Sequence, residues 1–232
     1  FPYTTLFRSV LYMLDGNAVM DKLDDAFLQQ LFAGSPPVIV AIGYQTALPF
    51  DTAARAWDYT PPLKTREPRA GKPALPPRKT GGNDVFRQLL TETMVPQTEA
   101  NLKIDPHQRA IWGHSYGGLF VLDAWRKASP FGIYYSASPS LGQALQSPLQ
   151  ASQSLDAVRF RGKSLYLLEG DGKARGEPSG HEASLEVLRQ TQQQLASKGL
   201  TVAFWRYPGL THGQMFEVSL RSALLHLSGQ AA

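Results

Sequence analysis

The chain has 232 residues, of which 43% are apolar, 18% are charged and none is cysteine. This length suits one large domain, because single α/β folds routinely reach about 200–250 residues. The lack of cysteine excludes a disulfide scaffold, a thiolate zinc site and a cysteine nucleophile. No apolar run approaches the ~18 residues that a membrane-spanning helix needs, and the net charge is a modest +4. The composition therefore predicts a globular protein without a membrane span.

The first nine residues differ from the rest of the chain. They resemble the translation of a sequencing-library adapter, and the chain does not begin with methionine. We expect residues 1–9 to be a non-native segment in front of a gene whose true beginning is lost; the alternative is an ordinary N-terminal strand. Residues 10–232 are then expected to form a single domain. A missing signal peptide says nothing about export in that case.

Strands and helices alternate along the rest of the sequence. Short apolar runs bounded by turn residues predict strands at residues 10–14, 38–42, 109–113, 133–136, 164–168 and 201–207. Apolar residues at helical spacing predict helices at about 20–33, 84–95, 117–127, 181–198 and 215–227. Several of the strands are apolar throughout, which is typical of a mostly parallel sheet with helices on both faces. The fold class is therefore α/β.

One segment breaks this alternation. Residues 45–83 hold seven prolines, and within residues 64–79 six basic residues accompany a single acidic one. Such a Pro-rich basic insertion could form a lid or rim that favours anionic ligands, or it could be a solvated loop. Nearby aromatic residues could stack on a substrate or pack in the core: Tyr44, Phe50, Trp57 and Tyr59. No nucleic-acid-binding signature accompanies them.

One motif indicates catalytic chemistry. Gly-His-Ser-Tyr-Gly at residues 113–117 matches G-x-S-x-G and lies between a predicted strand and a predicted helix, with a further glycine at Gly118. A nucleophile elbow has this context, because it holds its serine in a strained turn and needs small neighbours. The N–H of Tyr116, at the start of the helix, can then donate to a developing oxyanion. We predict Ser115 as the nucleophile; the alternative is a glycine-rich turn without chemistry.

A serine nucleophile needs a base, and His212 is the best-placed of the five histidines. It follows the last predicted strand and precedes the last helix, as the histidine does in the α/β-hydrolase order of Ser, acid, His. Its alternative role is to cap the loop. Surface, wall, helix-cap or packing roles are expected for the other four: His107, His114, His181 and His226.

The acid of a triad is less clearly marked. Asp171 follows the predicted strand at residues 164–168 and is the first candidate, with Glu169 next and Glu177 and Glu182 further along. A dyad without an acid is the alternative, with a carbonyl or water holding the imidazole tautomer.

A second oxyanion donor is expected after the first strand. Asp-Gly-Asn follows that strand, so the N–H of Gly16 or Asn17 is a candidate. The alternative is an ordinary turn.

Four blocks of the sequence resemble those of bacterial siderophore esterases, which open the enterobactin and salmochelin trilactones. These esterases belong to the wider group of esterase-D-like α/β-hydrolases. The blocks occur in the same order: Leu-Tyr-Met-Leu-Asp-Gly-Asn at 11–17, Arg-Ala-Trp-Asp-Tyr-Thr-Pro at 55–61, Gly-His-Ser-Tyr-Gly-Gly at 113–118 and Pro-Gly-Leu-Thr-His-Gly at 208–213. The resemblance covers roughly residues 10–228. The first and second blocks are more specific than the elbow, which many esterases share.

The resemblance implies an α/β-hydrolase fold that lacks its usual first strands. It places the nucleophile on Ser115, the base on His212 and an active-site arginine on Arg55. It further implies a Ser-His dyad, a periplasmic location and no metal or organic cofactor. The implied substrate is a small ester, and a ferric siderophore is one candidate for it. A cytoplasmic location is the alternative.

The sequence is compatible with three functions. The first is a serine esterase for catecholate siderophore trilactones, and the second is a general carboxylesterase acting on small acyl or feruloyl-like esters. The third is a binder that keeps the fold without turnover. Neither the preferred ester nor the oligomeric state follows from the residues.

Overall fold

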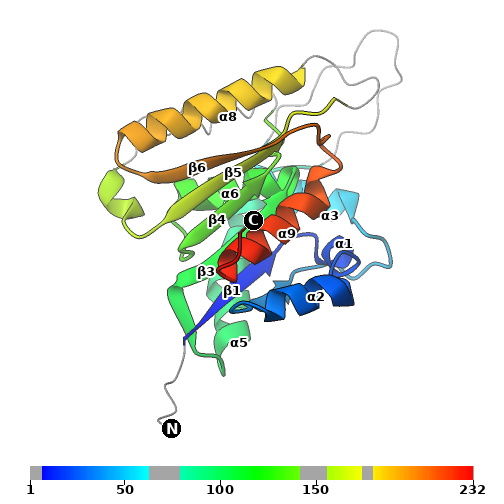
Figure 1. Ribbon diagram of the computed structural model, residues 1–232. Helices are drawn as coiled ribbons and strands as arrows, with labels where there is room; N and C mark the ends of the chain where they lie inside the picture. The colour runs from blue at the N-terminus through cyan, green and yellow to red at the C-terminus, as the bar shows by residue number, and fades with distance from the viewer. Residues whose placement is uncertain (1–6, 63–78, 142–155, 174–179, 232) are drawn as a thin grey trace.

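A computed structural model describes residues 7–62, 79–141, 156–173 and 180–231 (Figure 1). Within them, six parallel strands form one sheet in the order β2-β1-β3-β4-β5-β6. The strands are β1 (Arg8–Met13), β2 (Val38–Ala41), β3 (Ile104–His114), β4 (Ile133–Ala137), β5 (Ser164–Gly170) and β6 (Thr201–Tyr207).

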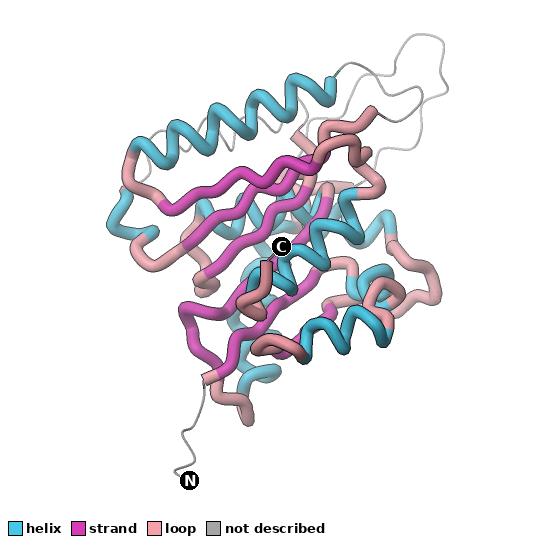
Figure 2. The backbone as a smooth tube through the Cα atoms, in the orientation of Figure 1, coloured by secondary structure: helices cyan, strands magenta, loops and turns pink. Residues whose placement is uncertain are grey.

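Helices cover both faces of this sheet, as the cyan helices flanking the magenta strands in Figure 2 show. One face packs against α1 (Gly16–Met20), α2 (Asp25–Phe32) and α9 (Met215–Leu227). The other face packs against α3 (Thr52–Tyr59), α4 (Asn83–Leu89), η1 (Leu90–Met94), α5 (Val95–Glu99), α6 (Tyr116–Arg126), η3 (Ala157–Phe160) and α8 (Gly180–Ser197). The expected α/β class with helices on both faces is confirmed.

Strand β1 shows why its sequence is apolar without alternation. Val10 and Tyr12 point into the core beneath α6, whereas Leu11 and Met13 point into the core beneath α9. Successive side chains of a strand face opposite sides of the sheet. Because both sides of β1 are covered, every one of these positions is buried.

The strand order has a topological switch point between β1 and β3. From β1 the chain first moves to β2 on one side, and it later returns as β3 on the other side of β1. In open parallel sheets, ligands bind outside the carboxyl ends of the strands at such a switch point. The loops that leave β1 and β3 begin at Leu14 and Ser115, so they meet at this position. The Leu14 N–H donates to the Trp112 carbonyl at 3.1 Å and holds the two loops side by side.

Several element boundaries differ from those expected. The single helix expected at residues 20–33 is two helices, because Asp24 accepts a hydrogen bond from the Phe27 N–H at 2.8 Å and starts α2 afresh. Strand β3 begins at Ile104, ahead of the expected start, and pairs there with Arg8. Strand β1 therefore begins within the segment expected to be non-native.

The insertion at residues 45–83 is described in part. It contains helix α3, which the proline-rich pattern did not predict, and Asp51 caps this helix with hydrogen bonds from two amides of its first turn. The basic residues from Lys64 to Arg78 lie outside the described residues, and Lys79 is the one that falls within them.

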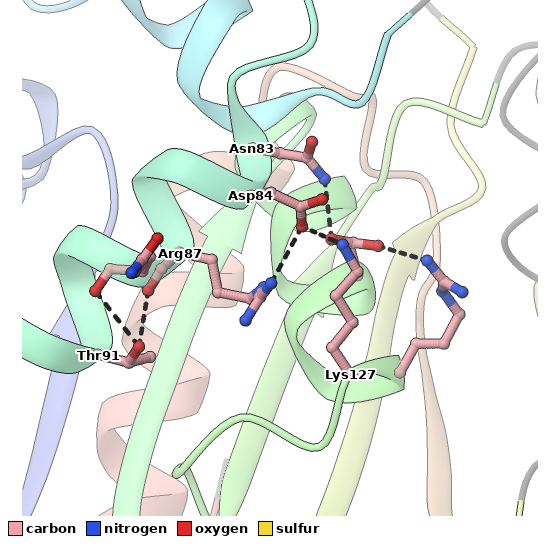
Figure 3. Close-up of polar contacts among 8 residues, drawn as sticks. Asn83, Asp84, Arg87, Thr91 and Lys127 are labelled. Atoms are coloured by element: carbon pink, nitrogen blue, oxygen red, sulfur yellow. Dashed lines mark hydrogen bonds and ion pairs between the residues drawn. The ribbon is translucent and has the colours of Figure 1, made fainter.

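A polar network joins α4 to the helix that follows the elbow (Figure 3). The Asn83 amide donates to Asp123 at 2.8 Å, and Asp123 also pairs with Arg126 and Lys127. Lys127 in turn pairs with Asp84. Asp123 is 5% exposed, and a buried carboxylate is stable only when it is paired and hydrogen-bonded in this way. The network therefore fixes α6 against its neighbour.

No helix among the described residues is both long enough and apolar enough to cross a lipid bilayer.

Candidate active site

Ser115 occupies a sharp turn between β3 and α6. Its φ of 59° and ψ of −114° lie in a region that residues with a side chain rarely adopt. The surrounding backbone holds this conformation, because the Ser115 N–H donates to the Ala137 carbonyl at 3.0 Å and the Ser115 carbonyl accepts from the Leu119 N–H at 3.0 Å. The side chain is partly exposed at the carboxyl end of the sheet. This geometry is the elbow that the motif predicts.

Two glycines of the motif are required by close packing. A Cβ on Gly113 would lie 2.5 Å from the backbone of Gly117, and one on Gly118 would lie 2.5 Å from the Ala137 carbonyl oxygen. Both distances are below any real van der Waals contact. A Cβ on Gly117 would meet only ordinary contacts, the nearest at 3.5 Å. The G-x-S-x-G-G spacing therefore reflects how tightly α6 returns over β3 and β4.

His212 lies beside the elbow, on the loop between β6 and α9. Its ring centroid is 4.7 Å from that of His114, the residue that precedes the nucleophile. His114 Nε2 lies 2.8 Å from the His212 carbonyl oxygen. Because a carbonyl only accepts, Nε2 of His114 carries the proton and donates it. The loop histidine is thus held against the nucleophile turn.

The electrostatic environment keeps His114 neutral. Burial, with the adjacent His212, lowers the pKa of His114 to about 3. The neutral His114 therefore carries its proton on Nε2 and donates it to the His212 carbonyl. This bond holds the loop of His212, and the role of His114 as a wall of the site stays a prediction.

Asp171, the expected acid, contacts other partners. Its two carboxylate oxygens accept hydrogen bonds from the Arg206 guanidinium at 2.6 Å and from the Gly209 N–H at 2.5 Å. The Gly209 N–H and the Arg206 charge lower the pKa of Asp171. These contacts fix the loop that leads to His212, and the role of Asp171 as a triad acid stays a prediction.

Glycines on both sides of Asp171 allow this loop contact. A Cβ on Gly170 would lie 2.1 Å from the Leu210 carbonyl oxygen, and one on Gly172 would lie 2.2 Å from that of Gly209. The Glu-Gly-Asp-Gly sequence is therefore a packing surface for the histidine loop. Of the other acid candidates, Glu169 is buried and accepts a hydrogen bond from the Ser138 hydroxyl at 2.6 Å. Glu177 lies outside the described residues, and Glu182 lies in α8.

Two backbone amides remain candidates for the oxyanion donors. Tyr116 is the first residue of α6 and Asn17 is the second residue of α1, so neither N–H has an acceptor within its own helix. The Gly16 N–H donates to the Ile42 carbonyl at 2.7 Å and is engaged there. We therefore assign the candidate donor role on this loop to Asn17 rather than to Gly16. The Asn17 side chain holds the loop through hydrogen bonds with the backbone of Tyr44 and Thr46.

Arg55 links the oxyanion loop to the elbow. Its guanidinium makes two 2.8 Å hydrogen bonds to Asp15, whose side chain is 1% exposed, and a longer one of 3.4 Å to the His114 carbonyl. Asp15 is the left-handed N-cap residue of α1, with a φ of 56°. The arginine therefore fixes the strained start of the loop after β1. We also predict that Arg55 orients the substrate or assists the oxyanion.

Ser140 is a site residue that the sequence analysis missed. It follows β4, and its hydroxyl oxygen lies 2.9 Å from that of Ser115. The signal available in the sequence was its position just past the carboxyl end of the strand next to β3. Among the remaining histidines, His226 hydrogen-bonds to Tyr135 at 2.7 Å and His107 is exposed, while His181 lies near the start of α8. Within the part of the chain that the structure describes, no cluster of three potential metal ligands is found.

Comparisons with known proteins agree with this geometry. The family model described as "Putative esterase" matches residues 8–227. The apo-salmochelin esterase of Escherichia coli O6:H1 is 47% identical over 96% of this chain and 70% of its own length. The ferri-bacillibactin esterase BesA of Bacillus subtilis is 35% identical over 95% of this chain and 80% of its own length.

A solved structure gives the same result for the fold. The enterobactin hydrolase IroE in complex with DFP superimposes with a TM-score of 0.83 at 46% identity. The match covers 97% of this chain and 84% of that one.

The depressed pKa of His114 predicts a pH dependence of stability. An unfolded histidine titrates near 6.5, so between pH 6.5 and about 3 the unfolded chain binds a proton that the folded chain does not. The free energy of unfolding should therefore fall as the pH falls through this window. For His114→Gln, urea unfolding at pH 6 to 4 should show a slope smaller than that of the wild type by about 1 kcal/mol per pH unit.

The matched control for that measurement is His107→Gln, because His107 is exposed. This control should keep the wild-type slope. Parallel slopes for His114→Gln and the wild type would contradict the assignment of a buried, neutral His114.

Proposed function

The chain belongs to the putative esterase family, and from this membership we propose that it hydrolyses the ester bonds of catecholate siderophore trilactones of the enterobactin and salmochelin kind. The enzyme is a carboxylic ester hydrolase. The observation that carries the proposal is the strained turn at Ser115, with the ring of His212 packed against the preceding residue. The relatives named for siderophore substrates support the substrate class.

In the proposed reaction, Ser115 Oγ attacks the ester carbonyl while His212 takes the hydroxyl proton. A bond forms between Oγ and the carbonyl carbon, and the carbonyl oxygen becomes an oxyanion. The N–H groups of Tyr116 and Asn17 donate to that oxyanion. His212 then gives its proton to the leaving alkoxide, and the acyl group stays on Ser115.

Water completes the cycle. His212 takes a proton from a water molecule that attacks the acyl-enzyme, and the second tetrahedral intermediate expels Ser115 Oγ, which recovers a proton from His212. The products are an alcohol and a free acid, so no cofactor enters the scheme. We propose the dyad form, because the contacts of Asp171 are with Arg206 and Gly209.

The surface near the site supports an aromatic substrate. Phe50 is 36% exposed and lies beside Arg55 and Phe216, so its ring is available for stacking on catechol groups. Trp57 is 43% exposed, but its ring lies against Gly82. Tyr59 is fully buried, and its hydroxyl oxygen accepts a hydrogen bond from the Asp15 N–H at 3.3 Å. Tyr44 is likewise engaged, through a hydrogen bond to Asp58 at 2.9 Å. We assign substrate stacking to Phe50 and core packing to the two tyrosines.

A periplasmic location is part of the proposal and rests on the resemblance to periplasmic siderophore esterases. Fractionation of the native host with an antibody against this chain tests it. Recovery with the cytoplasmic fraction would contradict it.

Replacement of the nucleophile tests the proposed function. Wild-type protein incubated with enterobactin should yield the linear trimer, which is detected by chromatography. Ser115→Ala should yield none, because no acyl-enzyme can form. A short-chain nitrophenyl ester is assayed in parallel. Turnover of the nitrophenyl ester alone would leave a general carboxylesterase, and full turnover by Ser115→Ala would overturn the nucleophile assignment.

Asp171→Asn separates a dyad from a triad. The substitution keeps an acceptor for the Gly209 N–H but removes the ion pair with Arg206. A dyad enzyme should therefore lose less than about tenfold in kcat/KM. A disabled triad acid typically costs ~10⁴-fold. Arg206→Gln is the control, since it breaks the same ion pair and leaves the carboxylate. A loss near ~10⁴-fold confined to Asp171→Asn would show that Asp171 is the acid.

A further inference from the structure

The residue that follows β4 by three positions contacts the nucleophile twice. The Ser140 hydroxyl oxygen lies 2.9 Å from Ser115 Oγ, and the Ser140 N–H donates to the Ser115 carbonyl at 3.2 Å. One residue therefore fixes both the backbone and the side chain of the proposed nucleophile. We propose that Ser140 is a positioning residue, whose hydroxyl donates to Ser115 Oγ and holds it in the orientation for attack. This inference rests on the proposed esterase function.

The direction of the hydrogen bond follows from the reaction. Either hydroxyl can be the donor in the resting protein. To give its proton to His212, Ser115 must direct its O–H hydrogen toward the imidazole, so that only its oxygen lone pairs remain for Ser140. Ser140 must then be the donor. A donor on Oγ also stabilises the negative charge that develops as the proton leaves.

The turn that carries Ser140 is held from below by a buried carboxylate. Ser138 has a φ of 38°, in the left-handed region, and it is 1% exposed. Its hydroxyl donates to Glu169 at 2.6 Å, and its N–H donates to the Leu168 carbonyl at 2.8 Å. A strained residue keeps such a conformation only where its surroundings over-determine it. Glu169, at the end of β5, thereby acts on Ser140 through Ser138.

This arrangement connects three neighbouring strands at the carboxyl end of the sheet. The nucleophile follows β3, Ser138 and Ser140 follow β4, and Glu169 is the penultimate residue of β5. Ser140 is partly exposed, whereas Ser138 and Glu169 are buried. The part of the turn that faces the site is thus separate from the part that anchors it, so each can be altered by itself.

The test uses a short-chain nitrophenyl ester, because kcat/KM for this substrate reports acylation of the serine. Ser140→Ala removes the hydroxyl and should lower kcat/KM about three- to tenfold, the range expected for one hydrogen bond. The loss should appear in kcat with KM unchanged, since the bond is to the nucleophile and not to the ester. Ser140→Thr keeps a hydroxyl and should stay within about twofold of the wild type.

Each other outcome overturns the inference. Wild-type kcat/KM in Ser140→Ala would show that the hydroxyl does not position Oγ, and equal losses in the alanine and threonine variants would show that the hydroxyl is not what matters. Thermal unfolding of each variant separates these results from loss of the fold. Failure of the proposed esterase function is recognised independently, because the wild type would then show no turnover that Ser115→Ala abolishes.

A double-mutant cycle tests the support that Ser138 gives to Ser140. If Ser138 acts only through the placement of Ser140, Ser138→Ala should lower kcat/KM, and Ser138→Ala combined with Ser140→Ala should lower it no further than Ser140→Ala alone. Additive losses would overturn this connection.

Discussion

The whole site depends on one strained residue at the end of β3. Ser115 has a positive φ, which exposes its side chain at the carboxyl end of the sheet and turns the chain directly into α6. Two backbone hydrogen bonds stabilise this conformation. The Ser115 N–H donates to the carbonyl of Ala137 on β4, and the Ser140 N–H, just after β4, donates to the Ser115 carbonyl. The glycines at 113 and 118 are needed for the same reason, since any side chain there would push strand and helix apart.

The two loops that complete the site are fixed by charges and close backbone contacts. Asp15 and Arg55 form an almost fully buried ion pair that holds the left-handed start of the oxyanion loop. Arg55 also has the rings of Phe50 and Tyr116 within about 5.5 Å of its guanidinium, where the cation is attracted to the aromatic faces. On the other side, Asp171 and the neutral His114 hold the loop of His212. These contacts hold the backbone of both loops in place, and donors fixed in advance are what the proposed oxyanion stabilisation requires.

Features that depend on local chemistry could be predicted from the sequence. The motif predicts the strained turn at Ser115, and the α/β-hydrolase chain order predicts that His212 lies beside it, as the structure shows. The role of His212 as the base stays a prediction. The alternation of strands and helices likewise predicts the parallel sheet. Asp24 is a recognisable helix cap, and attention to it would have divided the helix expected at residues 20–33.

Long-range partners could not be predicted in this way. Asp15 and Arg55 are 40 positions apart, and nothing in either residue type specifies the other. The early part of β3 was missed because Pro106 and polar neighbours are unfavourable in a strand. Ser140 was missed because serine is common in loops, and only the fold brings its hydroxyl to Ser115.

The central claim is that Ser115 is the nucleophile of this esterase, and covalent labelling tests it most directly. The native protein is treated with a fluorophosphonate probe, and the adduct is located by peptide mass spectrometry. One adduct per chain, on Ser115, is the result that the geometry predicts. An adduct on another residue, or none on a preparation that turns over esters, would contradict it.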